Sequence, residues 1–135
     1  MKHIDQPWLW GSLSIAWMAF IYTLSDTPAK DFDVARSTIK WLPFANSLVH
    51  IGLFMVLSVF VLRTLVLSRL VSQPLIAYLT IVITSAYGIL DEIHQSKIEG
   101  RTSETIDVVS DIFGSILIVV FWLLLKKFPS KTQKW

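Results

Sequence analysis

Apolar residues in this chain fall into four long segments separated by polar stretches. The segments are residues 8–24, 44–67, 75–95 and 106–125, and charged side chains are rare within them. A helix needs about 20 mainly apolar residues to cross the hydrocarbon core of a bilayer, and each segment approaches or reaches that length. We therefore predict an all-α membrane protein, with four transmembrane helices in a compact bundle.

The polar stretches predict how these helices are oriented. Four spans place both termini and the second connection on one side of the membrane. The basic residues on that side are Lys2, Arg63, Arg69, Lys126, Lys127, Lys131 and Lys134, and those on the other side are Lys30, Arg36, Lys40, Lys97 and Arg101. Lysine and arginine are more frequent in cytoplasmic loops, so this bias favours both termini in the cytoplasm.

Composition narrows the class of protein further. The 135 residues suit a single domain, residues 1–135, and 53% are hydrophobic while only 16% are charged. The net charge of +2 and the scattered lysines do not indicate a nucleic-acid partner. The chain has no cysteine, which excludes disulfides, thiolate metal sites and a cysteine nucleophile.

Residues 87–114 place a group of polar side chains between two otherwise apolar segments. Its ionisable and amide side chains include Asp91, Glu92, His94, Gln95, Arg101, Glu104, Asp107 and Asp111. Burying such groups near hydrocarbon is costly, so they indicate a functional site. In the predicted orientation, His50 near the start of the second helix lies at the same depth. We therefore expect a polar pocket at the outer membrane boundary.

Helical spacing places several of these residues on common faces. Tyr87, Asp91 and His94 follow an i, i+4, i+7 pattern on the third helix, and Asp107 and Asp111 are four residues apart on the fourth. A bundle could direct both faces toward one pocket. Several acids at one depth repel one another unless something binds between them.

Some of the polar residues have a simpler interpretation. Loop charges are usually solvated, and we interpret Glu92, Lys97, Glu99 and Glu104 in that way. A single histidine on an apolar helix is often a packing residue, but the match in depth with His94 favours a site role for His50. Gly114 follows Asp107 and Asp111 on their face and would let a neighbouring helix approach closely.

The residue types allow both acid–base chemistry and binding. The candidate catalytic residues are His50, Asp91, His94 and Asp107, with a histidine as general base oriented by Asp91. The candidate binding residues are Tyr87, Glu92, Gln95, Arg101 and Asp111, among which Arg101 suits a phosphate or carboxylate. Asp91 and His94 also have the carboxylate-x-x-His spacing of metal sites in helix bundles. This spacing alone identifies neither a metal nor a cofactor, and no nucleophile is evident.

Three sequence stretches resemble the VanZ-like family of small bacterial membrane proteins. They are YTLSDTP, SLVHIGLF and, most specifically, GILDEIHQSKIEGRTSETIDVVSDIFGSILI. The polar positions of the family match His50, Asp91, Glu92, His94, Gln95, Arg101, Asp107 and Gly114. The chain departs from the family pattern at Ile118, where glycine is frequent, at Asp111, where asparagine is usual, and at Phe54, where tyrosine is common.

The resemblance implies a cell-envelope role in the bacterial cytoplasmic membrane. The founding member is associated with resistance to the glycopeptide teicoplanin. The leading hypothesis is a pocket that binds the headgroup of an envelope lipid or amphiphile, with membrane lipids or lipid-linked envelope precursors as partners. One alternative is an intramembrane hydrolase or transferase acting on a lipid phosphate or ester. A second is ion or proton conduction.

Overall fold

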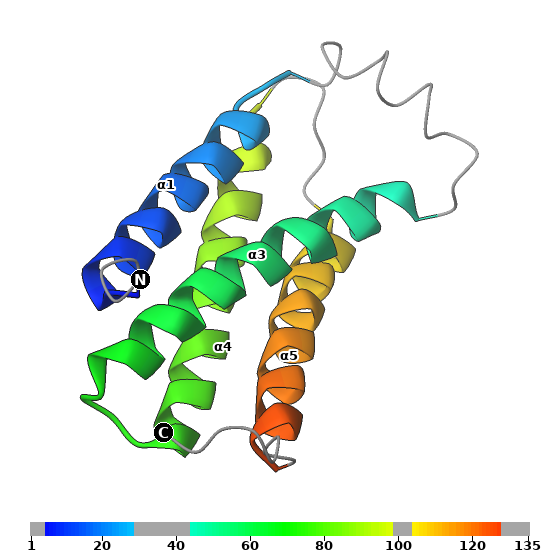
Figure 1. Cartoon of the computed structure of the whole chain (residues 1–135). Helices are drawn as coiled ribbons and strands as arrows, with labels where there is room; N and C mark the ends of the chain where they lie inside the picture. The colour runs from blue at the N-terminus through cyan, green and yellow to red at the C-terminus, as the bar shows by residue number, and fades with distance from the viewer. Residues whose placement is uncertain (1–4, 29–43, 99–103, 128–135) are drawn as a thin grey trace.

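The computed structural model describes residues 5–28, 44–98 and 104–127 and contains four α-helices within them (Figure 1). They are α1 (Pro7–Ser25), α3 (Ala45–Ser68), α4 (Gln73–Gln95) and α5 (Thr105–Lys127). Each begins and ends within two residues of an apolar segment of the sequence. The described residues form no strand, and the predicted all-α fold is confirmed.

Local sequence accounts for several of the helix ends. Pro7 and Pro74 lie in the first turns of α1 and α4, where a missing N–H breaks no helical hydrogen bond. Phe44 and Arg69 flank α3 with φ of 60° and 55°, in the left-handed region. A residue in that conformation cannot continue the helix, so Phe44 and Arg69 mark the two ends of α3.

Three of the four helices are long and apolar enough to cross a membrane, and these are α3, α4 and α5. The remaining helix, α1, has no charged residue but is not among these three. The chain is therefore a helical protein suited to a membrane. A fourth span through α1 and the cytoplasmic position of the termini stay predictions.

The helix α3 packs against α1, α4 and α5 (Figure 1). Its contact with α5 is close because Gly114 has no side chain: a Cβ there would lie 2.6 Å from the backbone oxygen of Ile51. The predicted close approach at Gly114 is thus confirmed. A core of Ile21, Phe54, Leu57 and Val61 fills the space between α1 and α3.

The bundle is more polar inside than a soluble protein of its size. Its buried side chains include serines, threonines, acids and a histidine, whereas large apolar side chains such as Leu90, Ile93 and Phe121 are exposed. Water-soluble proteins bury their large apolar residues and expose their acids. Hydrocarbon around the outer faces explains the inverted arrangement.

Candidate functional site

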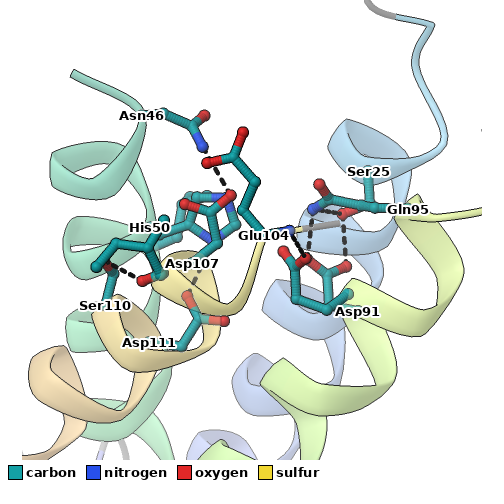
Figure 2. A network of polar contacts seen from close by, with 12 residues as sticks. Ser25, Asn46, His50, Asp91, Gln95, Glu104, Asp107, Ser110 and Asp111 are labelled. Carbon is teal, nitrogen blue, oxygen red and sulfur yellow. Dashed lines mark hydrogen bonds and ion pairs between the residues drawn. The ribbon is translucent and has the colours of Figure 1, made fainter. Parts of the chain in front are cut away.

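Buried ionisable side chains gather at one end of the bundle, where α1 and α4 end and α3 and α5 begin (Figures 1 and 2). Alternating helix directions bring these four ends together although they are far apart in the sequence. The polar residues form two groups. We call them the His50 cluster, which comprises Asn46, His50, Glu92, Asp107 and Asp111, and the Asp91 cluster, which comprises Ser25, Asp91 and Gln95.

The His50 cluster joins α3 to α5 through pairs spaced four residues apart on each helix. The Nδ1 atom of His50 lies 2.9 Å from Oδ1 of Asp111, and Nε2 lies 3.9 Å from Oδ2 of Asp107. The side-chain amide of Asn46 donates to the same Asp107 oxygen at 2.8 Å. One imidazole therefore lies between two carboxylates (Figure 2).

Burial of the His50 cluster is almost complete. His50, Asp107 and Asp111 are 5%, 2% and 1% exposed. The Oδ2 atom of Asp111 has no hydrogen-bond partner among the described residues. It packs against Gly88, where a Cβ would lie 2.7 Å away and would also touch Phe54. The two family-pattern departures at Phe54 and Asp111 thus lie on either side of the same glycine.

Glu92 adds a third helix to the His50 cluster. It is only 3% exposed and accepts a hydrogen bond from the backbone N–H of Glu104 at 3.1 Å. The interpretation of Glu92 as a solvated charge is therefore wrong, because the rotation of α4 turns this side chain toward α3 and α5. Lys97 and Glu104 are exposed, as solvated charges are.

The Asp91 cluster joins α4 to α1. Ser25 donates to Oδ1 of Asp91 at 2.5 Å, and the amide of Gln95 donates to Oδ2 of Asp91 at 2.9 Å and to Ser25 at 3.0 Å. All three side chains are buried. Asp91 is thus held by a hydroxyl and an amide rather than by a histidine.

His94 lies at the rim, outside both clusters. Its Nε2 atom is 3.2 Å from Oδ1 of Asp26, and its ring stacks on Tyr22 with 4.4 Å between centroids. The expected orientation of His94 by Asp91 does not form, because Asp91 bonds to Ser25 and Gln95, whereas His94 pairs with Asp26 just after α1. Tyr87 also donates to α1, at the carbonyl of Met18.

The predicted face of Tyr87, Asp91 and His94 is therefore real, but it packs against α1. The acids of α5 and Glu92 form the other group with His50. Within the described part of the chain, Asp91 and His94 do not belong to the group of side chains that could hold a metal ion. The carboxylates and imidazole that do converge are His50, Glu92 and Asp107, each with one ligand atom within 4.8 Å of the others.

Arg101, predicted to bind an anionic group, lies outside the described residues. Sequence reasoning missed four residues that the structure places in these networks: Tyr22, Ser25, Asp26 and Asn46. A signal for Asn46 was present, since it precedes His50 by one helical turn. The serine and aspartate of YTLSDTP end the first apolar segment at the depth predicted for the site.

Fold and site together define an all-α membrane protein with a buried imidazole and carboxylates at one end of apolar helices. The family model described as VanZ/LLP1 matches residues 10–126, which include most of all four helices. The chain belongs to this family, and the resemblance noted in its sequence is confirmed. Searches of curated proteins and of solved structures found no match.

Proposed function

We propose that this protein binds the polar headgroup of a cell-envelope lipid or other amphiphile at its His50 cluster. The alkyl part of the ligand would lie against the outer faces of α4 and α5. The observation that carries this proposal is the contrast between adjacent positions. Acids at Glu92 and Asp107 are buried, while their sequence neighbours Ile93 and Ile106 are large, apolar and exposed at the same level.

An energetic argument supports a ligand at this end. Burying a carboxylate costs free energy even when it accepts hydrogen bonds, and several carboxylates in one place repel one another. The chain nevertheless holds Glu92, Asp107 and Asp111 around one imidazole. Packing alone does not require such an arrangement, because apolar side chains of similar volume would fill the space at lower cost.

The chemistry of the cluster favours particular headgroups. Carboxylates accept hydrogen bonds, so an ammonium or hydroxyl group would pair with them directly. An anionic headgroup would need a positive partner, for which Arg101 is the candidate in the sequence. In the predicted orientation the cluster faces the outer leaflet of the cytoplasmic membrane. There it would meet membrane lipids or lipid-linked envelope precursors, and a contribution to teicoplanin resistance would follow from binding such a precursor.

Native mass spectrometry of the full chain in mild detergent tests this proposal. We expect wild-type protein to retain a lipid that Asp107→Asn and His50→Gln lose in large part. Arg63→Gln, which removes an exposed charge at the opposite end of the bundle, is the matched control and should retain the lipid. Absence of any retained lipid in the wild type, or equal retention in all variants, would overturn the proposal.

A second candidate function rests on the hydrogen bond between His50 and Asp111. A carboxylate at Nδ1 orients the imidazole and leaves Nε2 able to act as a general base toward a bound ester or phosphate. Attack would come from water or from a second substrate. Hydrolysis or transfer of a labelled lipid that His50→Gln abolishes and His94→Gln preserves would support catalysis. An inactive wild type in lipid bilayers containing phospholipids and polyprenyl phosphates would exclude it for those substrates.

A further inference from the structure

The three groups that converge at the polar end have the chemistry of metal ligands. His50, Glu92 and Asp107 come from α3, α4 and α5, and one ligand atom of each lies within 4.8 Å of the other two. All three are buried. Ligand atoms about 2.0–2.2 Å from a tetrahedral zinc ion are about 3.4 Å apart, so side-chain rotations would have to draw these three atoms closer together to close the set around one ion.

The orientation of His50 is an independent indication. Its Nδ1 atom lies 2.9 Å from Oδ1 of Asp111, so a neutral ring that donates to this carboxylate carries its lone pair on Nε2. Nε2 points toward Asp107 Oδ2 at 3.9 Å, beyond hydrogen-bond range. Histidine ligands of metal ions usually donate their other ring N–H to a carboxylate in this way. The ring is therefore buried and oriented, with Nε2 directed toward Asp107.

A supporting contact also reaches one of the acids. The amide of Asn46 donates to Oδ2 of Asp107 at 2.8 Å, which restricts the rotation of that carboxylate. Hydrogen bonds to ligating carboxylates are typical of the outer shell of metal sites. Asn46 and Asp111 thus stand behind Asp107 and His50, respectively, as positioning residues.

We propose that His50, Glu92 and Asp107 bind one divalent transition-metal ion such as Zn²⁺ or Mn²⁺. An imidazole with two carboxylates suits these ions, whereas Mg²⁺ and Ca²⁺ prefer oxygen ligands alone. Three protein ligands leave a coordination position for an oxygen of a bound headgroup. The inference shares its site with the proposed function and would explain how an acidic cluster accepts an anionic headgroup.

Manganese binding to the purified full chain tests the proposal. After chelation and dialysis, Mn²⁺ is titrated in detergent and free ion is followed by electron paramagnetic resonance. We expect one ion per chain, with nitrogen coupling from one imidazole in the pulsed spectrum. The same titration with Zn²⁺, followed by elemental analysis, tests the alternative ion.

Matched histidine variants locate the site. His50→Gln should weaken binding by at least about 10–100-fold and abolish the nitrogen coupling, and Asp111→Asn should weaken it by about 10–100-fold through loss of ring orientation. His94→Gln removes a histidine from the same end and should change neither the affinity for the metal nor the nitrogen coupling. Circular dichroism establishes that each variant is helical, and Asp111→Asn carries the test if His50→Gln does not fold.

Three results would overturn the metal site. They are a wild type that binds neither ion, equal weakening in His50→Gln and His94→Gln, and nitrogen coupling that persists in His50→Gln. Native mass spectrometry with and without chelator separates this inference from the proposed function. Lipid retained by a protein that binds no metal would contradict the metal site alone, and metal bound without any lipid would contradict the headgroup proposal alone.

Discussion

The two ends of the bundle both contain charged residues, but they hold them differently. At the end where α1 begins and α3 finishes, Arg63 donates to Asp5 through Nε at 3.1 Å and through Nη2. Trp10 donates to the same carboxylate, and the guanidinium lies 5.9 Å from its ring centroid. The Arg63 and Asp5 side chains are 43% and 46% exposed.

The opposite end, which contains the His50 cluster and is called the polar end, holds acidic side chains around a histidine. These side chains are almost completely buried. Exposed ion pairs contribute little to stability, so the pair of Arg63 and Asp5 is a solvated surface contact. Trp10 beside this pair is an aromatic residue of the kind found at membrane interfaces. Buried carboxylates, in contrast, need hydrogen bonds or an oppositely charged partner to offset the hydration that they lose. The difference agrees with the proposal that the functional site lies at the polar end. The following predictions test this comparison, from the largest expected effect to the smallest.

Replacing a charged residue by leucine should give the largest difference between the ends. His50→Leu leaves Asp111 buried without its imidazole, and we expect about 3–5 kcal/mol of destabilisation. Arg63→Leu should cost at most about 1 kcal/mol because its partner is solvated. Unfolding by sodium dodecyl sulfate in mixed micelles, followed by circular dichroism, measures both. Similar losses would remove the distinction between the ends.

Removing the hydroxyl of Ser25 should have the next largest effect. Ser25→Ala takes a hydrogen bond from the buried Asp91 carboxylate, and hydrogen bonds to charged groups are worth about 1.5–3 kcal/mol. Thr23→Ala, on the same helix, removes only an exposed hydroxyl that bonds to the carbonyl of Phe20. The same unfolding assay should show almost no change for this control. A Ser25→Ala protein as stable as the control would mean that the bond contributes little.

Glycine-to-alanine substitutions should destabilise the protein by different amounts in the two regions, because the helices pack more closely at Gly114 than at Gly11. An alanine Cβ at Gly114 would lie 2.6 Å from the Ile51 backbone oxygen, and we expect about 1–3 kcal/mol of destabilisation as α3 and α5 move apart. At Gly11, near the opposite end, the nearest contact is 3.7 Å from Thr64. Gly11→Ala should therefore be neutral or stabilising in thermal unfolding. Equal tolerance of both would contradict the close contact of α3 and α5.

The smallest expected effect is the loss of stability when Asp5 is replaced, which should depend on salt concentration. Asp5→Asn weakens an exposed ion pair, and we expect less than about 1 kcal/mol of destabilisation at low ionic strength. This difference should disappear in about 1 M sodium chloride, where screening acts over only a few ångströms. Thermal unfolding of wild type and variant at two salt concentrations measures it. A difference that persists at high salt would show that Asp5 has a role beyond the ion pair.

Much of the fold was predictable because apolar segments long enough to cross a bilayer have few stable conformations other than a helix. The helices therefore follow the segments closely, and Gly114 and Pro74 have the roles that their positions predict. The partners within the site were less predictable. Helical spacing placed Asp91 and His94 on one face, but it did not say which helix that face meets.

Glu92 illustrates this limit. Its sequence environment, beside a polar turn, resembles that of a solvated charge, yet the rotation of α4 buries it. Asn46 and Ser25 likewise acquire roles only from neighbours 61 and 66 residues away. Such pairings depend on how helices rotate and cross, which is decided by close packing across the bundle.

The amino-acid sequence by itself determined the family, the helices and the end of the bundle where polar residues gather. These follow from local patterns of apolar and polar positions, which act over a few helical turns. Only the tertiary structure decided that His50 meets Asp107, Asp111 and Glu92 while Asp91 and His94 turn toward α1. The physical reason is that a side chain's partners are set by the relative rotation of whole helices, to which distant residues all contribute.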